Sequence, residues 1–103
     1  MRRVAVTGLG ILSPIGNDLE SCWTAAIKGV SGIAKITSLD MSKQSVQIGG
    51  EVKNFEPAKY FSNEKEARRN QRFVQMAVAA SRMALTDAQL ELTDDIKNDA
   101  GVS

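Results

Sequence analysis

The chain has 103 residues, one cysteine, no histidine and a formal net charge of +1. A chain of this length forms one small domain at most. Its composition excludes a disulfide framework, a zinc site of histidines and cysteines, and a nucleophile that a histidine activates. The balanced charge gives no field toward nucleic acid, and no apolar run is long enough to span a membrane. We therefore expect a soluble cytoplasmic protein without bound nucleic acid, metal or cofactor.

The N-terminal third predicts a strand, a glycine-rich loop and a helix. Arg3–Thr7 is short and β-branched, as in a buried strand, and Gly8–Gly16 is typical of a loop. We expect Asn17 to cap the following helix, with Glu20 completing a capping box, and Gly29 to end it. The apolar positions of this helix have the spacing of one buried face: Leu19, Cys22, Trp23, Ala26 and Ile27.

The middle of the chain predicts a strand and a long helix. Residues 30–44 show no regular pattern, whereas Ser45–Phe55 alternates apolar and polar residues, which predicts a strand or hairpin. After a loop over Glu56–Asn63, we expect a helix over about Glu64–Asp87. The second half of this helix is apolar on most sides and rich in alanine. It should therefore be buried, and another backbone segment should be able to approach it closely.

The C-terminal residues predict an acidic loop followed by the start of a strand over Ala100–Ser103. The resulting order of strand, helix, strand, helix and strand is typical of an α/β fold, with a mainly parallel sheet on which helices pack. A parallel sheet needs cover on both faces, and two helices offer little. We therefore expect the chain to be a piece of something larger.

The Gly8-Leu9-Gly10 turn is the candidate site for nucleotide binding. A dinucleotide-binding fingerprint needs a third glycine, where this chain has Ser13 followed by Pro14. No acidic residue ends a second strand at the required distance, and no phosphate-binding lysine follows the glycines. We interpret the segment as a tight turn from sheet to helix, with an NAD(P)-binding Rossmann-type fragment as the alternative.

The single cysteine is the obvious candidate nucleophile. Cys22 lies in mid-helix on the apolar face beside Trp23, and no basic residue or helix N-terminus is placed to activate it. We interpret Cys22 as a small core residue and not as a catalytic one.

A basic cluster marks the start of the expected long helix: Lys65, Arg68, Arg69 and Arg72. On one continuous helix these four side chains project within a sector of about 100°. Such a sector suits phosphate or carboxylate groups. The alternative is a solvated helix start with Glu64 and Glu66 as partial partners. Because cations are disfavoured near a helix N-terminus, the clustering needs a compensating reason.

Several motifs occur in a characteristic order over the whole chain: Val6-Thr7-Gly8-Leu9-Gly10, Ser13-Pro14-Ile15-Gly16-Asn17, Phe55-Glu56-Pro57, Lys65-Glu66-Ala67-Arg68-Arg69 and Arg72-Phe73-Val74-Gln75. In this order and spacing the chain resembles the N-terminal part of the β-ketoacyl-acyl-carrier-protein synthases, and within them the type II synthases of bacterial fatty acid synthesis. The resemblance implies a thiolase-type fold of two βαβαβ halves and a homodimer. It also implies a decarboxylative Claisen condensation of an acyl thioester with malonyl carrier protein.

The resemblance further implies that no catalytic residue lies in this chain. In the family, the catalytic cysteine and both histidines follow position 103. Residues 1–103 would then form the N-terminal part of a synthase domain, truncated before the catalytic residues and inactive alone. A catalytically silent relative, such as the chain-length partner of polyketide synthases, is the alternative.

What carries over to this chain is the contact with acyl carrier protein. The resemblance implies that Lys65, Arg68 and Arg69 face the acidic recognition helix of the carrier. Arg72 joins them on helical geometry alone. Family members often carry Met-Asp where this chain has Asn70-Gln71, so Arg72 is expected to lack an acidic partner.

Overall fold

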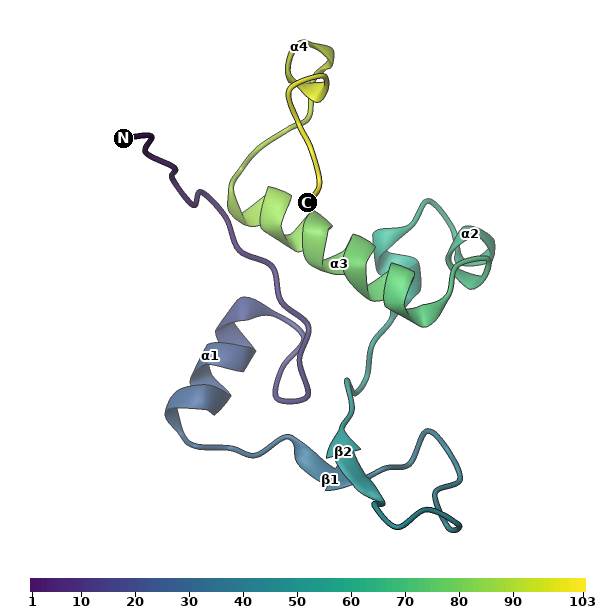
Figure 1. Cartoon of the computed structure of the whole chain (residues 1–103). Helices are drawn as coiled ribbons and strands as arrows, with labels where there is room; N and C mark the ends of the chain where they lie inside the picture. The colour runs from purple at the N-terminus through teal and green to yellow at the C-terminus, as the bar shows by residue number, and fades with distance from the viewer.

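The computed structural model describes residues 1–103. The molecule is elongated, with principal extents of 53 × 36 × 24 Å (Figure 1). Its elements in chain order are α1 (Leu19–Ile27), β1 (Ile33–Lys35), β2 (Ile48–Gly50), the 3-10 helix η1 (Pro57–Tyr60), α2 (Glu64–Arg68), α3 (Arg72–Asp87) and α4 (Asp94–Lys97). None of the helices combines the length and the apolar character needed to cross a membrane.

Helix α1 begins one residue later than its sequence predicts. The Asp18 carboxylate accepts a hydrogen bond of 2.7 Å from the backbone N–H of Ser21, and this bond holds the pKa of Asp18 below its usual value. Asn17 is not the cap, because its side-chain amide donates instead to the carbonyl of Lys53 at 2.6 Å. Gly29 follows the helix with φ +69°, a conformation that glycine adopts without strain, as expected for a helix stop.

The predicted apolar face of α1 is mostly exposed. Cys22 is its one buried residue, whereas Trp23 is 66% and Ile27 is 65% exposed. The helix packs against the loop before it, where a Cβ on Gly16 would lie 2.5 Å from the backbone nitrogen of Cys22. The interpretation of Cys22 as a small buried residue is confirmed. The prediction of a whole buried face is wrong for this chain, because nothing covers Trp23 and Ile27.

The N-terminal segment does not form the predicted strand. Arg3–Thr7 carries no strand pairing, and Val4 is 91% exposed. Ala100–Ser103 is also irregular. A strand needs a neighbouring strand to pair its backbone groups, and neither segment has one here.

Two glycines allow the N-terminal segment to pack closely on α3. Figure 1 shows the segment passing along this helix. A Cβ on Gly8 would overlap the carbonyl of Ala84, and one on Gly10 would overlap the carbonyl of Ala80. The N–H of Leu9 between them donates to the Asp87 carboxylate at 2.8 Å. The expectation that the alanine-rich helix admits another backbone closely is confirmed.

The only sheet is a two-stranded antiparallel hairpin. Strands β1 and β2 pair with Ile33 opposite Gly50 and Lys35 opposite Ile48. Strand β2 lies within the predicted segment 45–55, whereas β1 lies in a region that showed no regular pattern. A parallel sheet is therefore not formed by these residues.

Glu51 holds the hairpin to the turn that follows β1. Its carboxylate accepts the N–H groups of Thr37 at 2.8 Å and Ser38 at 3.0 Å. Hydrogen bonds from Ser38 and Thr37 lower the pKa of Glu51 to about 2. Pro14 packs closely against β2, since a Cβ on Gly50 would lie 2.8 Å from the proline ring.

The predicted long helix is two helices. Helix α2 ends at Arg68, and Gln71 is extended, with φ −67° and ψ 155°, before α3 begins. The Asn70 side chain donates to the carbonyl of Glu66 at 2.9 Å, which satisfies a carbonyl at the end of α2. A short polar side chain that bonds the backbone in this way competes with helix continuation.

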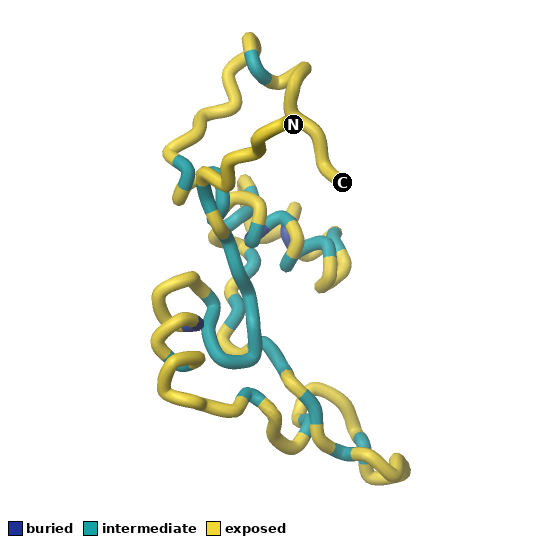
Figure 2. Tube along the Cα trace, turned by 60° about the vertical axis from the view of Figure 1, so that its left-hand side comes forward, coloured by how far each residue is buried: buried dark blue, intermediate teal, exposed yellow.

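Little of the chain is buried. Cys22, Ala67 and Ala79 are the only buried residues (Figure 2). The accessible surface is 8614 Å², whereas a compact monomer of this mass exposes about 5,700 Å². The radius of gyration is 16.7 Å, against about 13 Å for a compact domain of this length. Most apolar side chains therefore face solvent.

Candidate functional site

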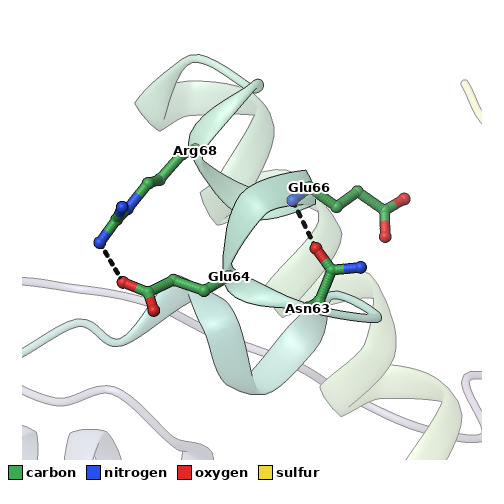
Figure 3. A network of polar contacts seen from close by, with 4 residues as sticks. All are labelled: Asn63, Glu64, Glu66 and Arg68. Carbon is green, nitrogen blue, oxygen red and sulfur yellow. Dashed lines mark hydrogen bonds and ion pairs between the residues drawn. The ribbon is translucent and has the colours of Figure 1, made fainter.

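The basic cluster lies largely on the short helix α2. The Asn63 side chain caps this helix by accepting the N–H of Glu66 at 2.8 Å (Figure 3). Glu64 begins the helix, whereas Arg68 is its last residue and Arg69 its C-cap. This order suits the helix dipole. For Arg68 and Arg69 the compensating reason is therefore the end of α2 at Arg68, which puts both at a helix C-terminus. Lys65, the second residue of the helix, is not explained in this way.

The cations on α2 differ in their partners. Arg68 forms an ion pair with Glu64, four residues earlier (Figure 3). Lys65 and Arg69 form no ion pair, and both are exposed. Arg68 and Arg69 follow Lys65 by three and four positions, so each of them neighbours Lys65 on the helix surface. The structure thus brings together three of the four predicted site residues, of which Lys65 and Arg69 form no ion pair.

Arg72 is separated from the other three. It is the first residue of α3, beyond the break at Asn70 and Gln71. Its guanidinium donates to the carbonyl of Val52 at 3.1 Å and lies 5.8 Å from the centroid of the Phe55 ring. The predicted single sector of four cations is therefore wrong. Although Arg72 has no acidic partner, its guanidinium is engaged by a carbonyl and an aromatic ring.

The acidic residues of α2 cancel only part of the basic charge, because two carboxylates stand against the three cations Lys65, Arg68 and Arg69. Glu64 is paired with Arg68, and the Glu66 carboxylate accepts the N–H of Ser62 at 3.3 Å. The exposed ammonium and guanidinium groups can each donate to carboxylate or phosphate oxygens. The arrangement suits an acidic partner surface.

The other sequence candidates do not form a chemical site. Cys22 is buried, with its Sγ 3.3 Å from the Ser13 hydroxyl. The backbone around Gly8 and Gly10 lies against α3, and the N–H of Leu9 is already bonded to Asp87. This loop therefore offers no open cradle for a phosphate. No group of three or more Cys, Asp or Glu side chains is placed to hold a metal ion.

An aromatic contact beside the basic helix escaped the sequence analysis. The rings of Phe55 and Tyr60 stack with centroids 6.2 Å apart and an interplanar angle of 23°. Gln75 of α3 donates its side-chain amide to the carbonyl of Ala67 in α2 at 2.8 Å. In the sequence, only the Phe55-Glu56-Pro57 motif drew attention to the region of the aromatic contact. No sequence feature indicated the hydrogen bond between Gln75 and Ala67.

Comparisons with known proteins give a consistent result. The sequence matches the family described as "Beta-ketoacyl synthase, N-terminal domain" over residues 1–103. It is 48% identical over 101 residues to a Staphylococcus aureus protein named 3-oxoacyl-[acyl-carrier-protein] synthase 2, covering 98% of this chain and 24% of that protein. A Synechocystis protein of the same name is 45% identical over 101 residues, with 98% and 24% covered.

A solved structure is also similar. The structure described as "The ishigamide ketosynthase/chain length factor" aligns with a TM-score of 0.72 and 35% identity, covering 87% of this chain and 22% of that one. The chain spans about a quarter of the length of the curated relatives it matches.

Proposed function

Because the chain belongs to the β-ketoacyl synthase family and matches its N-terminal domain over residues 1–103, we propose that it is the N-terminal part of a 3-oxoacyl-acyl-carrier-protein synthase of fatty acid biosynthesis. The observation that carries this proposal is 48% identity over 98% of the chain to a protein of that name. The reaction is the condensation of an acyl thioester with malonyl carrier protein, driven by decarboxylation.

In this proposal the chain contributes no catalytic group. Decarboxylative condensation needs an accessible thiolate for the acyl chain and groups that stabilise the developing carbanion. This chain has no histidine, and its one cysteine is buried. The catalytic residues therefore belong to the remainder of the protein, and residues 1–103 alone are inactive.

The contribution of this chain to function is the docking of acyl carrier protein. The proposal rests on Lys65 and Arg69, which are exposed and form no ion pair, with Arg68 beside them. Opposite charges on two surfaces raise the rate of encounter and fix the orientation of the partner. An acidic helix on the carrier would supply those charges.

Charge reversal tests the docking proposal. In the full-length protein, Lys65→Glu combined with Arg69→Glu should weaken carrier binding about tenfold, or about 1.4 kcal/mol, at low salt. The loss should shrink at high salt, because salt screens exposed charges. Isothermal titration calorimetry with acyl carrier protein at two salt concentrations measures both effects.

Lys28→Glu combined with Lys35→Glu is the matched control, because both are exposed cations outside the basic cluster and their reversal changes the net charge by the same amount. Its affinity for the carrier should equal that of the unaltered protein. Equal affinities for the control and the double variant would refute docking at α2.

A second function is favoured by one comparison. The similar solved structure is described as a ketosynthase together with a chain length factor. A catalytically silent partner of that kind would keep the fold and the docking surface without an acyl-enzyme. Intact-protein mass spectrometry after incubation with acyl carrier protein separates the two, since only a synthase gains the mass of the acyl chain.

We also propose that the full-length protein is a cytoplasmic homodimer. The support is the family membership. Analytical ultracentrifugation of the full-length protein tests the dimer.

A further inference from the structure

Arg72 joins three parts of the chain that are distant in sequence. From the first turn of α3, its guanidinium donates to the carbonyl of Val52, just after the hairpin, at 3.1 Å. The same group lies 5.8 Å from the centroid of the Phe55 ring, within the range of a cation–π interaction. Phe55 in turn stacks on Tyr60 of η1. A continuous set of contacts therefore runs from α3 to η1.

The position of η1 determines the position of α2. Both α2 and α3 pack against η1, and η1 leads into α2 through Phe61–Asn63 alone. At the far end of α2, the carbonyl of Ala67 accepts the side-chain amide of Gln75 at 2.8 Å. Since α2 has only five residues, these attachments and not its own hydrogen bonds orient it on the molecule.

We propose that Arg72 is a positioning residue that orients the basic helix α2, and not a fourth contact to the carrier. The inference rests on the proposed carrier-docking function. By holding the segment Val52–Tyr60 against α3, Arg72 fixes the direction in which Lys65 and Arg69 present their charges. Direct binding to a carrier carboxylate would draw the guanidinium away from the Val52 carbonyl and the Phe55 ring.

Three variants of the full-length protein separate positioning from direct contact. Arg72→Gln loses the cation that lies over Phe55, whereas Arg72→Lys keeps a cation and an N–H donor. Phe55→Leu removes the ring and leaves the charge of Arg72 untouched. Arg69→Gln serves as the control for a direct contact.

Two measurements are made on each variant. The first is the affinity for acyl carrier protein over a range of salt concentrations. The second is amide hydrogen exchange of residues 53–61, which reports whether the segment is held. For Arg72→Gln and Phe55→Leu we expect faster exchange and about fivefold weaker binding, with the dependence of affinity on salt unchanged. Arg72→Lys should restore most of the slow exchange and most of the affinity. Arg69→Gln should reduce the salt dependence of the affinity without changing exchange.

The proposal is overturned if Arg72→Gln reduces the salt dependence as Arg69→Gln does while exchange stays unchanged, because Arg72 would then contact the carrier directly. Unchanged exchange and unchanged affinity would also overturn it. If reversal of Lys65 and Arg69 leaves carrier binding intact, the docking function itself fails. In that case exchange alone decides whether Arg72 holds the segment: faster exchange in Arg72→Gln supports it, and no change refutes it.

Discussion

Neighbouring side chains of one type have different roles on this molecule because their partners differ. Arg68 and Arg69 are adjacent, yet Arg68 is paired with Glu64 and Arg69 with no acid. An exposed ion pair of this kind within one helix contributes only about 0.3–0.5 kcal/mol. Arg68 therefore remains able to exchange its partner, whereas Arg69 offers its charge without first breaking a pair.

Glu51 is the residue whose ionisation we expect to report on the hairpin. Its hydrogen bonds hold its pKa at about 2 in the folded chain, below the ordinary 4.5. Because the folded pKa is the lower one, the stabilisation by the carboxylate is complete above about pH 4.5 and is lost as the pH falls toward 2. Nuclear magnetic resonance of the Thr37 and Ser38 amides, which donate to the carboxylate, measures this titration in the full-length protein.

Between pH 5 and pH 3.5 the two amide signals should therefore barely move. The control is Glu51→Gln, whose amide signals should differ from those of the unaltered protein at pH 5, where the carboxylate is ionised. A titration midpoint close to 4.5 would show that the carboxylate is not held by the turn.

At the scale of elements, α3 is the platform of the molecule. The N-terminal segment lies on its alanines, and η1 packs against it. Periodicity predicted α1 and the body of α3, because a helix of two or more turns repeats its pattern within the sequence. The three-residue strand β1 and the break before Arg72 were not predictable in this way. The first depends on its pairing with β2, and the second on the bonding of Asn70 to Glu66.

The same reasoning explains the outcome for the candidate site. Lys65, Arg68 and Arg69 are close because they are neighbours on one helical turn, which sequence spacing reveals. The engagement of Arg72 with Val52 depends on a contact between residues 20 positions apart. No local pattern in the sequence indicates such a contact. Helical spacing alone therefore grouped Arg72 with the three cations of α2, although it lies on α3.

The seat of the N-terminal segment on α3 gives a prediction at this scale. Gly10→Ala places a methyl group against the carbonyl of Ala80, and we expect it to destabilise the full-length protein by about 1–3 kcal/mol. Gly101→Ala is the control, because a Cβ there meets nothing within 4 Å. Urea unfolding followed by circular dichroism measures both. Equal stability of the two variants would show that the segment is not seated on α3.

At the scale of the whole molecule, the chain has a large exposed surface and no parallel sheet. An α/β sheet is stable when its strands pair side by side and helices cover both faces. Here Arg3–Thr7 has no pairing neighbour, and the apolar side chains of α1 face solvent. The α/β class was predicted from the order of elements, whereas the strand pairing that the structure shows is the antiparallel pairing of β1 with β2.

The exposed apolar side chains of α1 provide a test of whether the rest of a synthase covers this helix. Trp23 is the single tryptophan of the chain and is 66% exposed, beside Ile27. Burying a side chain of this size removes a large apolar area from water, so it belongs at a packed interface. Acrylamide should quench Trp23 fluorescence strongly in the 103-residue chain and several-fold less in the full-length protein. In the full-length protein, the fluorescence of Trp23 is obtained by subtracting the fluorescence of a Trp23→Phe variant. Equally strong quenching in both proteins would mean that α1 faces solvent in the synthase as well, and that the open shape belongs to the native fold of this segment.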